Sequence, residues 1–199
     1  MKLKAFPAAL AVLLGAAAVP ASAQQLGSSG FEFLQAVEQR DGGKATQVLQ
    51  GQASVINARG DNGDGALHIV ARRRDSEWLR FMLSKGADAN LANRTGDTAL
   101  HIAARSGWLE GLDLLLLVKA RVDAANRLGE TPLIIAVQQK QLPTVRRLLE
   151  AGANPDKTDN ASGRSARDYA RLDTRSADML RVIDQTKARK PAAVAGPKL

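Results

Sequence analysis

The sequence repeats itself every 33 residues, and this period restricts the chain to a stack of similar units. One block occurs three times with this period: GALHIVAR at 65–72, TALHIAAR at 98–105 and TPLIIAVQ at 131–138. A second block keeps the same spacing: EWLRFMLSKGAD at 77–88, EGLDLLLLVKAR at 110–121 and PTVRRLLEAGAN at 143–154. Units of this length predict a solenoid, because a single unit can bury its apolar face only against its neighbours.

Each unit carries the signals of two short helices and a connecting loop. Thr98 and Thr131 precede apolar runs, where a hydroxyl can cap the first helix. Gly107 interrupts the apolar pattern, so we expect the second helix of the middle unit at about 109–118. The segments between units are rich in Asn, Asp and Gly, and they are predicted to form hairpin-like fingers at 87–97 and 120–130.

Three positions depart from the repeated pattern. Gly65 stands where the other units have a capping Thr, which predicts a weaker helix start. Ile134 replaces the His of the first two units. Lys119 replaces the glycine that follows the second helix in the other units, at Gly86 and Gly152. A left-handed backbone is expected there, so the Lys119 junction is predicted to be a weak point of the stack.

These blocks resemble the ankyrin repeat family, whose unit of about 33 residues contains the pattern T-P-L-H-x-A. The resemblance implies an all-α, ankyrin-repeat solenoid of helix-turn-helix units with β-hairpin-like fingers. Three full repeats are expected between two capping repeats, because a terminal unit needs a polar outer face. The expected bounds are a cap at 31–60, repeats at 61–93, 94–126 and 127–159, and a cap at 160–184.

The two ends of the chain differ in composition from the repeats. Residues 1–23 combine a basic start, an apolar run and a small-x-small site ending at Ala23, which together predict a cleaved signal peptide. The apolar run is too short to span a bilayer, and an uncleaved anchor is the alternative. We expect a periplasmic protein without a membrane span, with a linker at 24–30 and a disordered basic tail at 185–199.

The composition argues against catalysis and against metal binding. The chain has no Cys, which excludes disulfides, thiolate metal sites and thiol catalysis, and it has only two His, His68 and His101. The resemblance implies that both imidazoles bind backbone groups between adjacent fingers; the alternative, a zinc site, would also need carboxylates. Asp61 and Asp64 resemble part of a calcium loop that lacks its downstream ligands. We therefore predict no catalytic residue, no metal and no cofactor.

Positive charge is the remaining feature, since the formal net charge is +8. Arg94 and Arg127 lie one period apart at expected finger tips, and Arg105 ends a first helix. Such a row of guanidinium groups suits a partner with an acidic surface, because the planar fork binds carboxylates well. A solvated face is the alternative. Nucleic acid is not expected, because an exported protein rarely meets it and no aromatic residues interleave the charges.

The predicted function is non-catalytic protein binding by a monomer. The resemblance implies that finger tips and first helices form a concave face on which variable residues select the partner. These candidate residues are Asp61, Asn62, Asp64, Arg72, Arg73, Arg94, Thr95, Asp97, Arg105, Ser106, Arg127, Leu128, Glu130, Gln138 and Gln139. Two alternatives remain: an accessory protein that stabilises or protects a periplasmic enzyme, and an enzyme with a site in the groove.

Overall fold

The computed structural model describes residues 21–172 and 177–187. In these residues the chain forms ten α-helices and one short 3₁₀ helix, and its only β-type pairing is an isolated bridge. In chain order the elements are α1 (Ala21–Gln39), α2 (Gly42–Gly51), η1 (Ala53–Asn57), α3 (Ala66–Arg73), α4 (Ser76–Ser84), α5 (Ala99–Ser106), α6 (Leu109–Leu117), α7 (Pro132–Gln138), α8 (Leu142–Glu150), α9 (Ala166–Leu172) and α10 (Ala177–Lys187).

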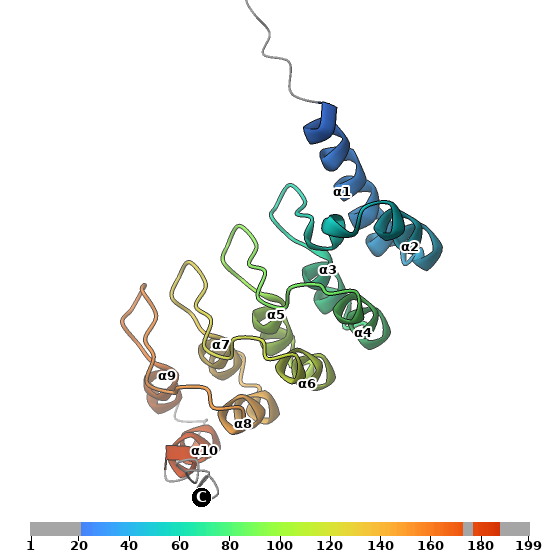
Figure 1. Ribbon diagram of the computed structural model, residues 1–199. Helices are drawn as coiled ribbons and strands as arrows, with labels where there is room; N and C mark the ends of the chain where they lie inside the picture. Colours follow the sequence, from blue (N-terminus) through green and yellow to red (C-terminus); the bar gives the residue numbers. More distant parts are fainter. Residues whose placement is uncertain (1–20, 173–176, 188–199) are drawn as a thin grey trace, which may run out of the picture.

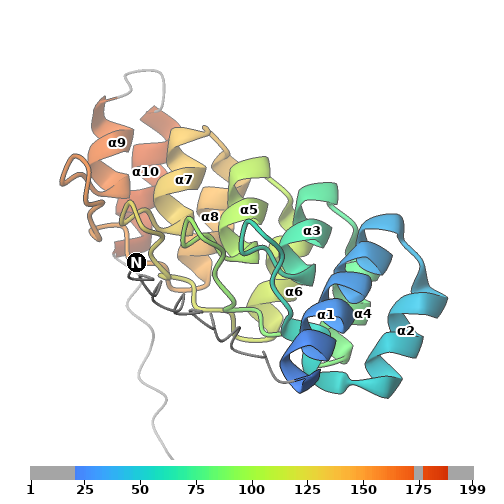
Figure 2. The same cartoon turned by 90° about the horizontal axis from the view of Figure 1, so that it is seen from above.

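The helices form two parallel rows (Figures 1 and 2). The first helices α3, α5, α7 and α9 pack in sequence against one another, and the second helices α4, α6, α8 and α10 form the other row. The loops between units project as fingers beside the first row (Figure 1). The predicted all-α solenoid is therefore confirmed. We call the side made by fingers and first helices the inner face, and the exposed side of the second helices the outer face.

A continuous core of small and aliphatic side chains runs through the stack. The first helices contribute alanines, such as Ala71, Ala103 and Ala136, which are fully buried and let neighbouring helices approach closely. The second helices contribute leucines, such as Leu79 and Leu112, which are also fully buried. Each unit therefore hides its apolar side only because the next unit covers it.

The first helices begin in two different ways. Thr131 caps α7 as predicted, because its hydroxyl accepts the N–H of Ile134 at 3.2 Å. Thr98 does not cap α5 in this way. Its Oγ1 lies 2.9 Å from Nδ1 of His101, and this ring nitrogen accepts the N–H of Thr98 at 3.1 Å. The imidazole within the helix thus accepts the backbone N–H of the residue that precedes the helix, which is the reciprocal half of a capping box.

The second helices end alike in all three full units. Lys119 has a φ of 60°, and the equivalent Gly86 and Gly152 have φ values of 86° and 92°. The N–H of Lys119 reaches the carbonyl of Leu116 at 2.9 Å, and the N–H of Ala120 reaches that of Leu115 at 3.0 Å. Lys119 therefore occupies the left-handed position of a Schellman-type helix end, as the sequence predicted.

The expected linker at 24–30 is instead helical, because α1 begins at Ala21. The second half of α1 buries Phe33 and Val37 in the core. Extending a helix from an anchored turn costs far less than starting one, so the polar residues before it continue the helix. The expected tail also starts later than predicted, since α10 continues to Lys187.

Most of the expected signal peptide, residues 1–20, and residues 188–199 of the expected tail lie outside the described residues. Within the described part of the chain, no helix combines the length and the apolar composition that crossing a membrane requires.

Candidate functional site

Backbone hydrogen bonds join the finger tips into one surface. The N–H of Arg94 donates to the carbonyl of Asn62 in the preceding finger at 3.2 Å. One unit further, the N–H of Arg127 donates to the carbonyl of Thr95 at 3.0 Å. Adjacent tips are thus held in register, and residues at equivalent positions of successive tips lie next to one another.

Asparagine side chains hold the base of the two middle fingers. Asn93 Oδ1 accepts the backbone N–H groups of Thr95 and Asp97 at 3.0 Å each, which closes its own turn. Its Nδ2 donates to Oδ1 of Asp64 in the preceding finger at 2.9 Å. Asn126 repeats this arrangement and donates to Oδ1 of Asp97 at 2.9 Å. Neither asparagine is among the site residues predicted from the sequence, although their spacing of one full period is a signal that could have found them.

The buried carboxylates that the asparagines bind are also bound by two arginines of the first helices. Arg72 is paired with Asp64, and Arg105 Nη1 donates to Oδ2 of Asp97 at 3.0 Å. Burial works to raise the pKa of Asp64, but hydrogen bonds from Arg72 and Asn93 outweigh it and hold that pKa below its usual value. The Arg72 and Arg105 side chains remain 47% and 43% exposed, so both also present charge to solvent on the inner face.

The two histidines tie each first helix to the next finger. His68 Nδ1 accepts the N–H of Gly65 at 3.1 Å, while Nε2 lies 2.9 Å from the carbonyl oxygen of Asp97. His101 makes the matching pair of bonds, with Nε2 3.2 Å from the carbonyl oxygen of Glu130. A ring that accepts at Nδ1 and donates at Nε2 is neutral, and burial lowers the pKa of both imidazoles. This geometry is the backbone-binding role that the resemblance implies.

The structure places the predicted partner-binding residues in three classes. Exposed residues are Asp61, Asn62, Arg72, Arg94, Thr95, Arg105, Arg127, Leu128 and Gln139. Partly buried residues are Arg73, Ser106, Glu130 and Gln138. Asp64 and Asp97 are buried, with exposed fractions of 4% and 7%. Their carboxylates bind asparagine and arginine side chains inside the finger bases and are not exposed for contact with a partner.

Arg73, which the sequence also assigned to partner binding, connects two helices of the stack. Its Nη1 donates to the carbonyl oxygens of Val37 and Glu38 at 2.6 and 2.9 Å, at the end of α1. The same guanidinium lies 5.8 Å from the ring centre of Trp78. A cation suits these positions, since the last carbonyls of a helix carry partial negative charge. Arg73 therefore holds the N-terminal helix to α3.

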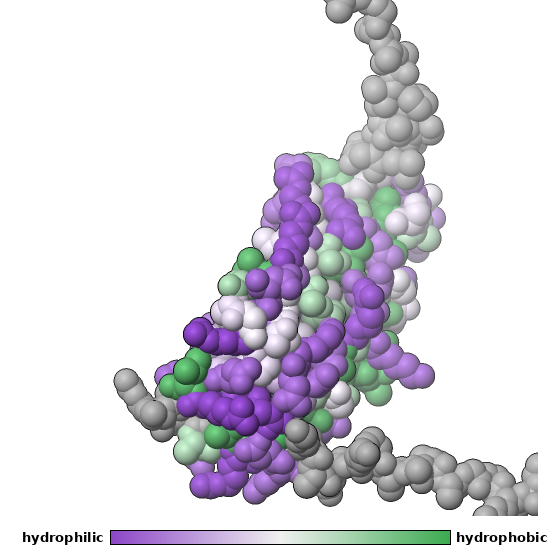
Figure 3. All heavy atoms as spheres, turned by 90° about the vertical axis from the view of Figure 1, so that its left-hand side faces the viewer, coloured by the Kyte–Doolittle hydropathy of each residue, from purple (hydrophilic) through white to green (hydrophobic). Residues whose placement is uncertain are grey.

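Arg94 and Arg127 differ from Arg72, Arg73 and Arg105 of the first helices. Both side chains are exposed at finger tips, and neither side chain makes a hydrogen bond or ion pair with another residue of the described chain. Figure 3 views the molecule from the side on which the fingers lie, and this face is covered mainly by hydrophilic side chains. Its two unpaired guanidinium groups can bind carboxylates without first breaking an internal contact.

The inner face is also hollowed at its N-terminal end. A cavity of about 740 Å³ lies between α1, the first finger and α3, with Leu34 and Ile69 among its apolar walls and Arg59 and Arg72 among its polar ones. Phe31 lines it and is 68% exposed. Phe31 falls in the predicted capping repeat and is not among the site residues predicted from the sequence. An aromatic residue at the start of an apolar run is ordinarily buried, so its exposure could not be read from the pattern.

Within residues 21–172 and 177–187, no group of three or more Asp, Glu or His side chains is arranged to hold a metal ion. The polar groups gathered at the finger bases instead satisfy one another through hydrogen bonds and ion pairs.

The comparison with sequence families agrees with this geometry. The family described as ankyrin repeats (3 copies) matches residues 33–126 and again 67–159, which together cover more than half of the 199 residues. A comparison with curated proteins gives no significant match. Ankyrin repeats generally form protein-interaction modules and are typically non-catalytic. The period, the paired helices, the stacked fingers and this match together show that the chain belongs to the ankyrin repeat family.

Proposed function

We propose that this protein is a non-catalytic binding module that recognises an acidic protein surface through its inner face. The observation that carries the proposal is the pair of exposed, unpaired guanidinium groups of Arg94 and Arg127 on adjacent finger tips. Arg72 and Arg105 extend the positive surface along the first helices while remaining bound to buried carboxylates. The planar guanidinium fork of an arginine can bind a carboxylate through two hydrogen bonds.

We also propose that the protein works in the periplasm after cleavage of residues 1–23, on the grounds of their sequence pattern. The test is an intact-mass measurement on the protein recovered from its native host. A chain that starts at Gln24 supports export. A chain that retains residues 1–23 contradicts export, and it would leave the inner-face proposal to be tested in another compartment.

The partner is best found by crosslinking in the exported fraction, followed by affinity purification and mass spectrometry. The binding proposal is then tested by titration calorimetry with the purified partner. Each of Arg94→Ala and Arg127→Ala is expected to weaken binding by about 1–2 kcal/mol. Affinity should also fall as salt is added, because the charges are exposed and therefore screened.

Arg171 and Arg181 provide matched controls. Both are exposed arginines in the C-terminal helices, Arg171 on α9 and Arg181 on α10, and each is paired with an aspartate on its own helix. Replacing either by Ala is expected to change binding by less than about 0.5 kcal/mol. If the control variants weaken binding as much as the tip variants do, the positive charge acts only as a general attraction and the inner-face site is wrong.

A further inference from the structure

The first helices reverse the sign of their inner-face charge at the N-terminal end of the stack. The helices α1, α3 and α5 are each followed by a residue with a left-handed backbone: Arg40, Arg74 and Gly107. Two positions before this residue stand Glu38 in α1, Arg72 in α3 and Arg105 in α5. The equivalent position therefore carries a carboxylate in the first of these helices and a guanidinium group in the next two.

The finger tips show the same reversal. Asp61, Arg94 and Arg127 are all exposed, and each is one period of 33 residues from the next. Backbone hydrogen bonds hold the three tips in register. The carboxylate of Asp61 therefore takes the place in the first tip that guanidinium groups take in the two tips after it, so both charged positions of the inner face become acidic at the same end.

Both of these carboxylates line the cavity of about 740 Å³ between α1, the first finger and α3, which we call the N-terminal cavity. Glu38 and Asp61 are exposed, and neither carboxylate makes a hydrogen bond or an ion pair within the part of the chain that the structure describes. Arg73 attracts the Glu38 carboxylate without pairing with it, because this guanidinium binds backbone carbonyls at the end of α1. The N-terminal cavity thus has two carboxylates that can receive a cation.

The arginines of the N-terminal cavity do not satisfy these carboxylates. Arg72 is paired with Asp64, and Arg59 donates to a backbone carbonyl of the next finger. Three acidic and two basic side chains are found among the described residues that line the cavity, so its net charge is negative. The charge of this cavity is therefore complementary to a cation.

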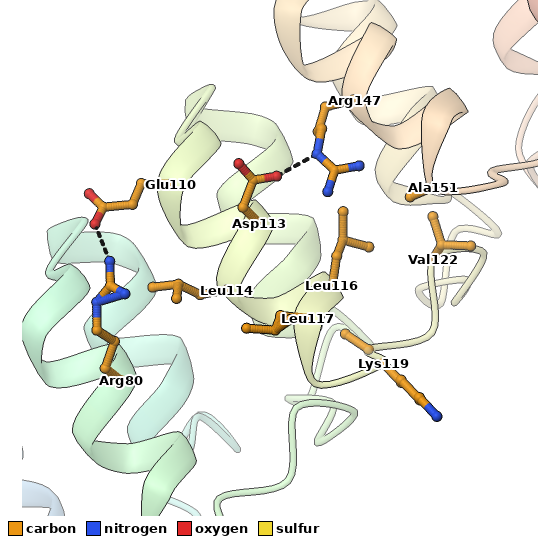
Figure 4. A pocket seen from close by; sticks show the side chains of 11 residues that line it. Arg80, Glu110, Asp113, Leu114, Leu116, Leu117, Lys119, Val122, Arg147 and Ala151 are labelled. Carbon is orange, nitrogen blue, oxygen red and sulfur yellow. Dashed lines mark hydrogen bonds and ion pairs between the residues drawn. The ribbon is translucent and has the colours of Figure 1, made fainter.

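A second cavity, on the outer face, shows a different arrangement of carboxylates. It has a volume of about 770 Å³ and lies between α4, α6 and α8 (Figure 4). Both of its carboxylates are paired: Glu110 with Arg80 at 2.8 Å, and Asp113 with Arg147 at 2.5 Å. The outer cavity therefore neutralises its own acidic side chains, whereas the N-terminal cavity leaves Glu38 and Asp61 without a cation.

The walls of the N-terminal cavity suit the rest of a basic side chain. Phe31, Leu34 and Glu38 lie on one face of α1, because they are spaced by three and four residues. Leu34 and Ile69 provide apolar surface, against which the carbon stem of a lysine or arginine can pack while its charged end stays in water. Phe31 is 68% exposed, and an aromatic ring attracts a cation.

We propose that the N-terminal cavity binds an arginine or lysine side chain of the partner protein. Its carbon stem packs against Leu34 and Ile69, and its cation meets the carboxylates of Glu38 and Asp61. The proposal rests on the proposed function in that the occupant belongs to a protein partner. It adds that this partner carries a basic residue beside its acidic surface, so that the two opposite charges of the inner face select one orientation of the partner.

An NMR titration of the ¹⁵N-labelled protein with the blocked peptide acetyl-Ala-Arg-Ala-amide tests the proposal. The arginine side chain is the only charge of this peptide. We expect saturable shifts of the backbone amides of Gly60, Asp61 and Asn62, with a Kd of about 1 mM, since the ligand is small. The same peptide with citrulline, which has nearly the shape of arginine but no charge, should bind about tenfold more weakly.

The carboxylates are tested by Glu38→Gln and Asp61→Asn, which keep the size of each side chain. Each change should raise the Kd for the arginine peptide about two- to fivefold, and the double variant should raise it about tenfold. Glu32→Gln is the matched control, because Glu32 is exposed on the same helix but borders α2 instead. It should leave the Kd within about twofold of the unmodified protein. Circular dichroism should show that all the variants are folded.

Three results would overturn the proposal: no saturable shift at the first finger, equal affinity for the arginine and citrulline peptides, or an equal loss of affinity in Glu32→Gln and in the cavity variants. The peptide has no acidic group, so such a result would leave the role proposed for Arg94 and Arg127 standing. Conversely, a partner that binds without these two arginines would leave the peptide measurement unaffected.

Discussion

Arg105 Nη1 donates a hydrogen bond to Oδ2 of Asp97 at 3.0 Å, and this bond joins a half-exposed cation to a buried carboxylate eight residues earlier. The same pair occurs one unit before it, between Arg72 and Asp64. The other carboxylate oxygen of Asp97 accepts from Asn126 of the next finger. Each buried aspartate therefore connects its own first helix to two fingers, and the inner face depends on these connections for its shape.

The first prediction concerns this buried aspartate. Asp97→Asn keeps the size of the side chain but replaces an acceptor by a donor, which would face either Arg105 or Nδ2 of Asn126. We expect the free energy of unfolding to fall by about 2–3 kcal/mol, as chemical denaturation would measure. Asp113→Asn is the control, because its pair with Arg147 is exposed and should contribute less than about 0.5 kcal/mol. Equal losses in the two variants would contradict the role given to Asp97.

The second prediction is a loss of stability on mild acidification. Burial lowers the pKa of His68 and His101 below the ordinary value of 6.5, so the unfolded chain takes up protons before the folded chain does. The two imidazoles therefore make their full contribution to the free energy of unfolding above pH 6.5, and this contribution declines as the pH falls below 6.5. Denaturation curves at pH 7.5 and at about pH 5.5 should show the difference. The double variant His68→Gln/His101→Gln should be less sensitive to pH across this range, and an unchanged pH dependence would assign it to other groups.

The third prediction is that Lys119→Gly stabilises the fold. A Cβ at a φ of 60° is unfavourable, and glycine removes this cost while gaining some freedom in the unfolded chain. We expect a net gain of about 0.5–1 kcal/mol in chemical denaturation at low protein concentration. Lys85→Gly is the control, because its φ is −86° and glycine there should destabilise the helix end. A lower midpoint for Lys119→Gly would mean that its side chain makes contacts that outweigh the strain.

The fourth prediction concerns the pair Gly65 and Leu91. A Cβ at Gly65 would lie 2.5 Å from Cδ2 of Leu91 and 3.2 Å from the carbonyl oxygen of Ala58. One unit later, the equivalent pair is Thr98 with the small Ala124. Gly65→Thr alone should therefore not stabilise the protein, although a threonine caps helices better than glycine does.

The double variant Gly65→Thr/Leu91→Ala tests the explanation. The change in the free energy of unfolding of the double variant should be more favourable, by about 1 kcal/mol, than the sum of the changes in the two single variants, because the alanine makes room for the threonine. If the changes in the free energy of unfolding simply add, Leu91 can move aside without cost, and contact with Leu91 is not the reason that a glycine stands at position 65.

The sequence by itself determined the features that depend on residues close together in the chain. The constant period predicted the units, Gly107 predicted the break between α5 and α6, and the alignment of Lys119 with two glycines predicted its left-handed backbone. These features follow from local conformational preferences that are repeated at a fixed spacing, so comparing one unit with the next was enough to find them.

Tertiary structure alone decided which polar residues reach solvent. Asp64 and Arg94 are both charged finger residues, yet the first is buried by Asn93 and Arg72 while the second remains exposed. Likewise, the polar residues before Phe33 are helical because they extend an anchored turn. In a solenoid, a side chain is buried by residues of the neighbouring unit, which lie about 30 residues away in the sequence. Local composition does not contain that information, so a polar side chain in a loop looks exposed until the stack covers it.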